Sequence, residues 1–388
     1  MLSAASTSQL LNAAASDGAV RPRVVWEGSP FVHHSLSLVN REIGRRLIEF
    51  PIELSWRPFE PDSFDASTRP ELQALSARIN AELSGSPQVE IRHRWPPRLD
   101  PVAQGKLVVI QPWEFGSLPR TWVEPMRDNV DEIWVPTHYV RDIYLEAGLA
   151  ESKVVVIPNG VDTQRFDPNV EPMSLPTQKR FRFLFVGGTI ARKGISGLLE
   201  AYCRTFTRLD DVVLVIKDLG GQGVYRGQTA RDLIRSIHAD PHAPEILHFD
   251  AEIPDADLPS LYAAADAFVH PYLGEGFGLP IAEAMAMQRP IIVTGLGAAL
   301  DFCDEGCAWL VPAERQYLSQ SRVGDLETVG RPWLARPDLT ILGDHMRHVF
   351  DGGPDIDIRT RAARLRILSG FTWDLVASKV YERLLQLS

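Results

Sequence analysis

The sequence predicts an α/β protein in which two doubly wound domains face each other across a cleft. Three observations support this fold class. The chain has 388 residues, more than one ordinary core holds, which points to two domains. Short apolar runs alternate with helical patterns along the chain, as in parallel sheets with crossover helices. Residues 166–180 are polar, with three prolines and no strong periodicity, which is typical of an interdomain linker.

The N-terminal domain is expected over residues 22–165. Apolar residues recur at helical spacing between Leu36 and Leu47, which predicts a helix after the first strand. Thr137 stands at the cap position of a later helix that ends before Gly148. The strands predicted in this half are Arg23–Glu27, Val89–Arg92, Lys106–Gln111, Glu132–Val135 and Lys153–Pro158.

The C-terminal domain is expected over residues 181–371, followed by a separate helix in residues 372–388. That last helix is amphipathic over Thr372–Leu387, with Thr372 or Ser369 available as its cap. The strands predicted in this half are Phe181–Val186, Val212–Lys217, Ile246–Phe249, Ala267–His270, Pro290–Val293 and Trp309–Val311.

Composition narrows the class of protein. The content of 45% hydrophobic and 23% charged residues is that of a soluble globular chain. A net charge of −10 argues against a general nucleic-acid binder. The three cysteines form no disulfide framework or zinc set, and we expect a cytoplasmic protein. Residues 1–21 lack Lys and Arg before Arg21 and do not match a secretory signal. They are interpreted as a flexible lead-in or as the scar of excision from a longer polypeptide.

The most informative segment is HPYLGEGFGLPIAEAMAMQRPIIVT, residues 270–294. Its glycine loop holds Glu275 and the run Gly276, Phe277 and Gly278, and a helix opens at Pro280. Free backbone N–H groups at such a helix start favour phosphate. A carboxylate beside them, here Glu283, can accept hydrogen bonds from ribose hydroxyls. Glu283 alone would be interpreted as complementing the helix dipole. Together with Glu275 and the loop, it indicates nucleotide binding.

At these residues the chain resembles the retaining nucleotide-sugar glycosyltransferases of family 4, also called glycosyl transferases group 1. Their signature is a pair of glutamates with this spacing, and the resemblance runs from about Val154 to the C-terminus. It implies the GT-B fold, with two Rossmann-like domains and a last helix that crosses back to the first. It also implies transfer of a hexosyl or related sugar, with retention of configuration, from a nucleoside diphosphate sugar. The acceptor would be a glycan, a lipid-linked glycan or another hydroxyl, as in polysaccharide biosynthesis, with no metal or cofactor required.

The segment FVGGTIARKG carries the basic residues of the expected donor site. Gly187 and Gly188 follow a strand and allow close approach of a ligand, while Arg192 and Lys193 would meet its phosphates. A basic pair at a helix start is more often solvated surface. In the resembling family a Lys-Gly here holds the diphosphate, which assigns Lys193. The family's usual Arg after the first glycine is replaced by Gly188. We expect Lys193, Arg192 and Glu275 to be catalytic.

Three further residues lie at strand ends, and each has both a structural and a functional interpretation. Lys217 and Asp218 are interpreted equally well as a surface ion pair or as contacts to the nucleotide. His270 ends the strand before the glutamate loop and either lines the site or is a satisfied structural histidine.

The loop QPWEFGSLP is the strongest feature of the first half. Trp113 and Glu114 suit the C–H faces and hydroxyls of a sugar, whereas Phe115 is expected to pack beneath the loop. The resembling family often has a histidine here, and its absence leaves the catalytic role of this loop open. Gly28 matches the family's N-terminal glycine loop near the transferred sugar, although weakly.

Two arginine clusters raise the alternative of a peripheral membrane contact. Many members of the resembling family touch anionic membranes through a basic N-domain surface, and solvated faces are the more common explanation. The clusters are Arg41, Arg45 and Arg46 on one helix, and Arg92, Arg94 and Arg98 around Trp95.

Two other functions stay open at the level of sequence. A nucleotide-sugar epimerase of the same fold would need its own acid–base carboxylates and would turn over without an acceptor. A non-catalytic module that only binds a sugar nucleotide would have the donor-binding residues and nothing more of the site.

Overall fold

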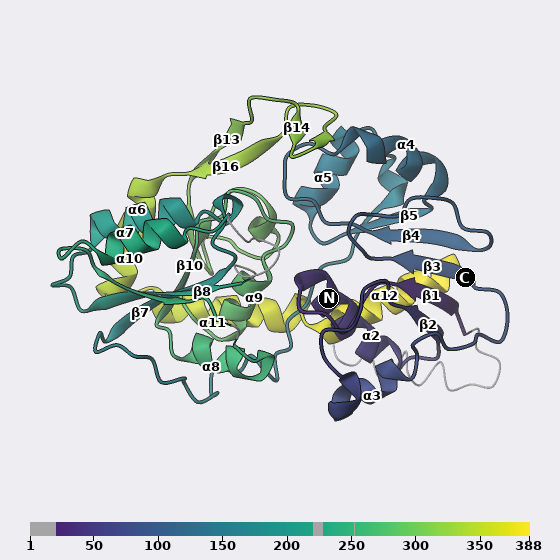
Figure 1. Cartoon of the computed structure of the whole chain (residues 1–388), viewed down its shortest axis with the longest axis horizontal. Coiled ribbons are helices and arrows are strands. Elements are labelled where there is room, and N and C mark those ends of the chain that lie inside the picture. Colours follow the sequence, from purple (N-terminus) through teal and green to yellow (C-terminus); the bar gives the residue numbers. More distant parts are fainter. Residues whose placement is uncertain (1–20, 220–227, 252) are drawn as a thin grey trace.

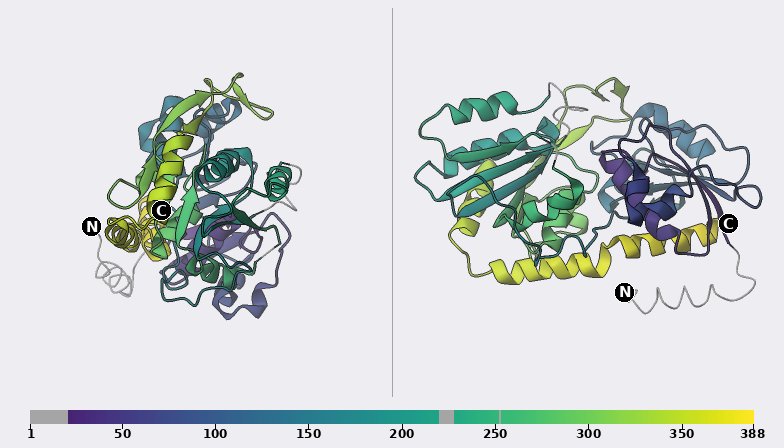
Figure 2. Two further views of the ribbon diagram at one scale, coloured as in Figure 1. Left: turned by 90° about the vertical axis from the view of Figure 1, so that its left-hand side faces the viewer. Right: turned by 60° about the horizontal axis from the view of Figure 1, so that its bottom comes forward.

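The structure is a computed structural model that describes residues 21–219, 228–251 and 253–388 (Figure 1). The interpretation of residues 1–21 as a lead-in or a scar therefore lies almost wholly outside the described residues. Two halves stand side by side, each built on a parallel sheet, and helices lie on the faces of both sheets (Figures 1 and 2).

The sheet of the first half has the order β2-β1-β3-β4-β5-β6. Its faces carry two apolar cores, one of which includes Trp26 and Trp56, stacked with their ring centroids 4.8 Å apart. The strands are β1 Arg23–Glu27, β2 Glu53–Arg57, β3 Val89–Arg92, β4 Lys106–Ile110, β5 Glu132–Val135 and β6 Val154–Val156. The helices are α2 Ser35–Leu47, η1 Ala66–Thr68, α3 Pro70–Ser76, α4 Arg120–Asn129, α5 His138–Glu146 and η2 Glu151–Lys153.

The sheet of the second half has the order β12-β11-β10-β7-β8-β9, again with a core on each face. Its strands are β7 Phe181–Gly187, β8 Val212–Asp218, β9 Glu245–Phe249, β10 Ala267–His270, β11 Ile291–Thr294 and β12 Trp309–Val311. Its helices are η3 Ala191–Lys193, α6 Ile195–Thr205, α7 Arg231–His238, η4 Asp255–Asp257, α8 Leu258–Ala263, α9 Leu279–Ala286, η5 Ala298–Asp301, α10 Leu339–Phe350 and α11 Ile356–Gly370.

The strands predicted from apolar runs are confirmed to within one or two residues. The cap prediction at Thr137 is also confirmed, because its hydroxyl accepts a hydrogen bond from the amide of Val140 at the start of α5. Strand β2 was missed. It is a short edge strand whose run, ELSWR, contains three polar residues.

A β-arm, residues 313–337, was also missed. It is a pair of antiparallel ribbons, β13 Ala313–Tyr317 with β16 Trp333–Pro337 and β14 Arg322–Val323 with β15 Leu326–Glu327. The arm leaves the second domain after β12 and reaches α4 of the first (Figure 1). There the amide of Gly116 donates to the carbonyl of Trp333 at 3.0 Å. The amide of Val329 donates to the carbonyl of Leu118, also at 3.0 Å.

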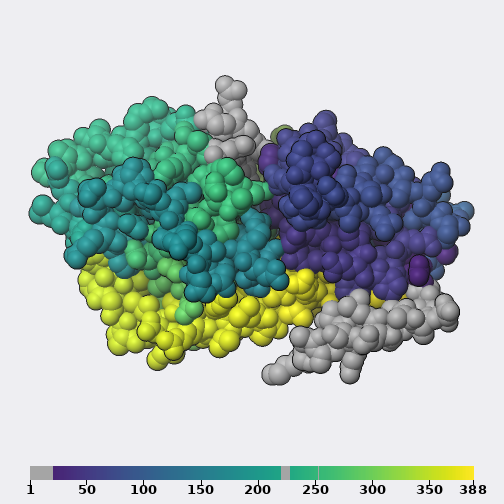
Figure 3. Space-filling view, turned by 90° about the horizontal axis from the view of Figure 1, so that it is seen from below, coloured from purple at the N-terminus to yellow at the C-terminus, as the bar shows by residue number. Residues whose placement is uncertain are grey.

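Two segments join the halves on the side away from the arm. The chain between β6 and β7 lies against the second domain, where Phe166 enters the core and the amide of Met173 donates to the carbonyl of Ser260 at 2.9 Å. The last helix, α12 Trp373–Leu387, packs on α2 within the core of the first domain. In space-filling view the C-terminal segment with α11 and α12 forms a band that runs along the second half and reaches the first (Figure 3).

Candidate functional site

The site is built at the carboxyl ends of β7 and β10, which are neighbours in the second sheet. Parallel strands bring the loops that follow them to one edge, where ligands of doubly wound folds bind. The amide of Leu273 donates to the carbonyl of Arg192 at 2.8 Å, which joins the two loops. Gly194 has φ +76°, and a Cβ there would lie 1.9 Å from the carbonyl oxygen of Pro271. The close approach of the loops therefore requires glycine at this position.

Glu275 lies at the centre of the site, with 5% of its surface exposed. Lys193 Nζ donates to Glu275 Oε1, and Arg192 Nη1 lies 3.9 Å from Glu275 Oε2. Burial alone would raise the pKa of Glu275, but the neighbouring Lys193, His270 and Arg192 outweigh it and hold that pKa well below the usual range. The three residues expected to be catalytic thus form one charged cluster, in which Glu275 is buried and the two cations are half-buried.

Of the two interpretations of His270, its burial beneath this cluster favours the structural one. Its side chain is fully buried and stacks on Phe185 of β7, with ring centroids 5.0 Å apart. Its Nε2 lies 3.2 Å from Glu275 Oε1, and burial lowers the pKa of the imidazole. His270 therefore orients Glu275 and does not reach a ligand itself.

The first domain touches the cluster through Glu114. Its carboxylate lies 3.3 Å from Arg192 Nη2, across the boundary between the domains. Gly274 permits this approach, since a Cβ there would lie 2.6 Å from the carbonyl oxygen of Glu114. The hydroxyl of Thr137 also donates to the carbonyl of Gly276 at 3.0 Å. Glu114 thus comes to the site as expected for the facing domain.

Asp218 holds the Gly187–Gly188 turn in place. Its carboxylate accepts from the amide of Thr189 at 3.0 Å and from the hydroxyl of Thr189 at 2.7 Å. Lys217 is 2% exposed and donates to the carbonyls of Asp218 and Ala251. The interpretation of these two residues as a surface ion pair is therefore wrong.

Glu283 lies in the first turns of α9 with 7% of its surface exposed. The hydroxyl of Tyr262 donates to Glu283 Oε2 at 2.8 Å. Burial raises the pKa of Glu283 to about 7, only partly opposed by the hydrogen bond from Tyr262. The carboxyl lines a cavity of about 40 Å³ between the domains, together with Asp255 and Arg165.

The glycine loop before α9 combines a glycine at the helix start with an aromatic side chain that packs in the core. Gly278 has φ +97° at the helix start, a conformation that favours glycine. The side chain of Phe277, assigned to the donor site, instead packs in the core against Phe302 with ring centroids 4.9 Å apart. Only the backbone of Phe277 is left for a ligand.

Trp113 requires a further correction. Its indole is 3% exposed, belongs to an apolar core, and donates from Nε1 to the carbonyl of Ser117 at 2.8 Å. It cannot present a face to a sugar, whereas Phe115, expected to be the packing residue, is less buried.

Gly28 is buried. A Cβ there would lie 2.5 Å from Asn40 Nδ2 and 2.7 Å from the carbonyl oxygen of His93, so packing within the first domain requires glycine at this position. Its place near the transferred sugar stays a prediction.

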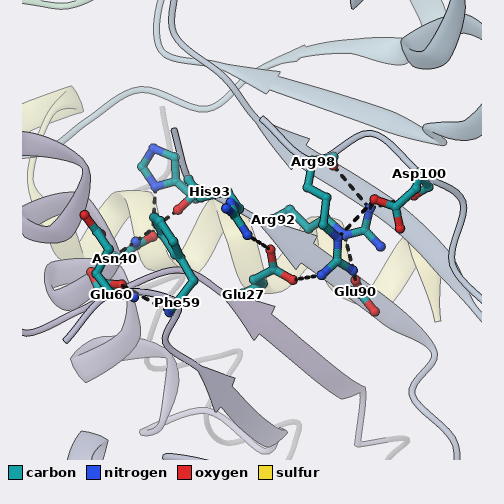
Figure 4. Close-up of polar contacts among 11 residues, drawn as sticks. Glu27, Asn40, Phe59, Glu60, Glu90, Arg92, His93, Arg98 and Asp100 are labelled. Carbon is teal, nitrogen blue, oxygen red and sulfur yellow. Dashed lines mark hydrogen bonds and ion pairs between the residues drawn. The ribbon is translucent and has the colours of Figure 1, made fainter. Parts of the chain in front are cut away.

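Both arginine clusters are paired with carboxylates, so the positive charges within each cluster are balanced. Arg45 and Arg46 contact Glu42 and Asp162, and Arg41 lies 3.6 Å from Asp255. In the second cluster Arg92 and Arg98 meet the carboxylates of Glu27, Glu90 and Asp100 (Figure 4).

Across the described ranges, no group of three His, Cys, Asp or Glu side chains is placed to hold a metal ion. Nor does any helix in those ranges combine the length and apolar character needed to cross a membrane.

Sequence reasoning missed Tyr262, Thr189 and the arm residue Trp333. Tyr262 and Thr189 act through hydrogen bonds to Glu283 and Asp218, 21 and 29 residues away, and no local pattern marks such partners. Trp333 could have been singled out from the sequence, because it is a large aromatic residue in a polar stretch. Its contact with Gly116, however, depends on the fold.

Comparison with known proteins covers both halves. Residues 14–165 match the glycosyltransferase family 4 model, and residues 180–321 match glycosyl transferases group 1. The MMP α-(1→4)-mannosyltransferase of Mycolicibacterium hassiacum is 27% identical over 62% of this chain and 51% of that protein. The phosphatidyl-myo-inositol mannosyltransferase of Mycobacterium tuberculosis is 31% identical over 59% of this chain and 53% of that protein. The chain thus spans about half the length of these relatives.

Solved structures show the same fold over nearly the whole chain. A glycosyltransferase from Rickettsia africae superposes with a TM-score of 0.67 at 16% identity, covering 95% of this chain and 100% of that one. Anabaena HepE, solved with UDP and glucose, superposes with a TM-score of 0.66 at 14% identity, covering 94% and 99%. The two facing α/β domains are therefore those of the GT-B fold.

Proposed function

The chain belongs to the family 4 glycosyltransferases, and from this premise we propose that it moves a sugar from a nucleoside diphosphate sugar to a hydroxyl acceptor with retention of configuration. The single observation that carries this proposal is the charged cluster of Lys193, Arg192 and the buried Glu275, which Glu114 of the first domain contacts from the other side. Two cations beside loop amides at a helix start suit a diphosphate.

The proposed chemistry assigns a role to each group of this cluster. The bond between the sugar C1 and the phosphate oxygen breaks, and negative charge grows on the diphosphate. Lys193, Arg192 and the amides of the loop at Gly276 stabilise that charge as it develops. The acceptor oxygen bonds to C1 from the same face, and its proton passes to the departing phosphate oxygen. Glu275, held ionised by its neighbours, accepts hydrogen bonds from hydroxyls of the donor sugar. No metal or other cofactor takes part in this scheme.

Glu283 is proposed to hold the nucleotide. Its carboxylate, oriented by the Tyr262 hydroxyl, would accept the two ribose hydroxyls. The names of relatives suggest which donors to test first. One relative is called a GDP-mannose-dependent mannosyltransferase, and a structural neighbour was solved with UDP-glucose. We therefore propose a hexose donor linked to GDP or UDP, and a glycan or other hydroxyl acceptor bound on the first domain.

Nucleotide binding tests this proposal. Calorimetry with UDP, GDP, ADP and dTDP would be run on the parent, on Glu283→Ala and on Glu305→Ala, a matched control at an exposed glutamate of the same domain. Loss of a charged hydrogen bond predicts that Glu283→Ala weakens binding by about 1.5–3 kcal/mol, with the control unchanged. Equal affinities of Glu283→Ala and the parent would remove Glu283 from the site. Conversion of a nucleotide sugar without any acceptor would instead indicate an epimerase.

A further inference from the structure

The loop that follows β3, residues 93–100, is not used by the proposed chemistry. Strand β3 lies between β1 and β4, so this loop emerges at the same sheet edge as the Glu114 loop after β4. At the base of the loop, the amide of His93 donates to the carbonyl of Glu27 at 2.8 Å. The loop therefore lies on the side of the first domain that carries the proposed acceptor site.

Buried charges fix the shape of this loop. Arg92 is 2% exposed, and its Nη1 donates to the carbonyl of Asp100 at 2.6 Å and to that of Arg98 at 3.2 Å. Arg98 in turn donates to Glu27 and, at 3.1 Å, to Glu90 (Figure 4). Hydrogen bonds to charged groups are the stronger ones in proteins. The loop is thus held in one conformation before any ligand arrives.

This rigid loop presents Trp95, 49% of which is exposed. The rest of the indole packs on Trp122 of α4, with ring centroids 5.7 Å apart, and Trp122 packs on Trp113 at 5.1 Å. Arg94, the residue before Trp95, has different neighbours: its guanidinium lies over the ring of Phe59 at 4.3 Å, and its Nη1 donates to Glu27 Oε1 at 3.2 Å. A half-open indole therefore stands two aromatic contacts away from Trp113, in the loop that carries Glu114.

We propose that Trp95 forms a subsite for an oligosaccharide acceptor, where it binds a sugar at some distance from the one that receives the transferred residue. The inference rests on the proposed function and names its substrate class. The C–H face of a pyranose packs on an indole. A rigid platform binds with little loss of conformational entropy.

The charges around Trp95 favour a glycan over a membrane surface. The three cations Arg92, Arg94 and Arg98 are balanced by the three carboxylates of Glu27, Glu90 and Asp100. Docking on anionic lipids needs an excess of positive charge, and this cluster has none. Binding of a neutral, hydroxyl-rich glycan does not need an excess of positive charge.

The test measures glycan binding by the full chain without donor. Calorimetry with a panel of di- to tetrasaccharides and their matching methyl monosaccharides would be run on the parent, Trp95→Ala, Trp95→Phe and the exposed control Leu209→Ala. The parent should bind at least one oligosaccharide more tightly than its monosaccharide. Trp95→Ala should weaken that binding by about five- to tenfold, which corresponds to one aromatic contact. Trp95→Phe and Leu209→Ala should bind like the parent, and monosaccharide binding should not change.

Three results would overturn the subsite. They are equal oligosaccharide binding by Trp95→Ala and the parent, no oligosaccharide binding by the parent, and loss of binding to phosphatidylglycerol vesicles in Trp95→Ala. The proposed function is judged separately, by transfer from nucleotide sugars. A parent that binds oligosaccharides through Trp95 yet transfers no sugar would contradict the function and leave the glycan subsite standing.

Discussion

Glu275 is buried and Lys193 is half-buried, with 16% of its side chain exposed, and the two side chains form an ion pair. Removing one partner of a buried pair leaves an uncompensated charge, which costs about 3–5 kcal/mol. A variant of Lys193 alone therefore mixes a loss of stability with a loss of chemistry. A single variant and a double variant of the pair must be compared to separate these effects.

We predict that Lys193→Met is destabilised by about 3–5 kcal/mol and loses turnover more than donor affinity, because the charge that Lys193 meets is greatest in the transition state. Lys193→Met combined with Glu275→Gln removes both charges and should recover much of the stability without recovering transfer. Chemical denaturation and transfer kinetics on both variants measure the two effects. A double variant that transfers like the parent would show that the pair is structural only.

Glu283 gives a second prediction, on the pH dependence of stability. Its pKa is about 7 in the folded chain against an ordinary 4.5, so the folded state binds a proton that the unfolded state has released. Stability should therefore fall as pH rises from about 4.5 to 7 and then level off. The difference between the two pKa values corresponds to about 3 kcal/mol at most.

Glu283→Gln should remove this part of the pH dependence, since the amide does not ionise. At pH 8 the variant should be more stable than the parent, by up to about 3 kcal/mol, and at pH 4.5 the two should be alike. Urea denaturation at several pH values measures this difference. Parallel pH profiles of parent and variant would mean that Glu283 is already ionised in the folded chain.

At single positions, the sequence identified which residues meet but not which way each side chain turns. Lys193, Arg192 and Glu275 come together as the motifs suggested. Trp113 is buried and Phe115 less so, opposite to expectation. A loop of mixed aromatics and glycines has no periodicity, so nothing in it tells the inner side chain from the outer one.

Among the elements, the arm has the greatest consequence for the site. It contacts both loops of the cleft, because the amide of Ala335 donates to the carbonyl of Leu273 at 2.7 Å while Trp333 fills the space beside Gly116. The arm of the donor domain thus fixes the loop that carries Glu114. Its strands were missed because β13 reads AERQY and is largely exposed, without the apolar alternation that marks a half-buried strand.

A third prediction tests whether the arm positions the loop that carries Glu114 and Gly116, on the side of the proposed acceptor site. A Cβ at Gly116 would lie 1.9 Å from Trp333 Nε1, so Gly116→Ala must displace a rigid indole. We expect a raised acceptor KM with unchanged nucleotide affinity. Adding Trp333→Ala removes the clash and should restore part of acceptor use. Steady-state kinetics measure both.

Gly370→Ala is the matched control for the arm variants, because no described atom lies within 4 Å of the added carbon. Normal acceptor kinetics in Gly116→Ala would show that the arm does not affect acceptor binding. A double variant that uses the acceptor no better than the single variant would show the same.

At the scale of the whole molecule, the domains meet on several sides. The arm, the Glu114–Arg192 pair and the Thr137–Gly276 hydrogen bond lie on the cleft side, and α12 joins the halves from beneath (Figure 2). Both parallel sheets were predictable because buried strands read as continuous apolar runs. The contacts between domains were not, since residues such as Glu114 and Arg192 are 78 positions apart and meet only once both sheets have formed.

The central claim is that this closed cleft transfers a sugar from a nucleotide donor with retention. The most direct measurement is a proton NMR time course with the full chain, α-linked GDP- and UDP-hexoses and a panel of oligosaccharide acceptors. The one-bond carbon–proton coupling at the anomeric centre of the first product reports its configuration for gluco and manno sugars alike. We predict a new α-glycosidic signal that grows as the nucleoside diphosphate is released. A β-linked first product would contradict retention, and no transfer from any donor would contradict the proposed function itself.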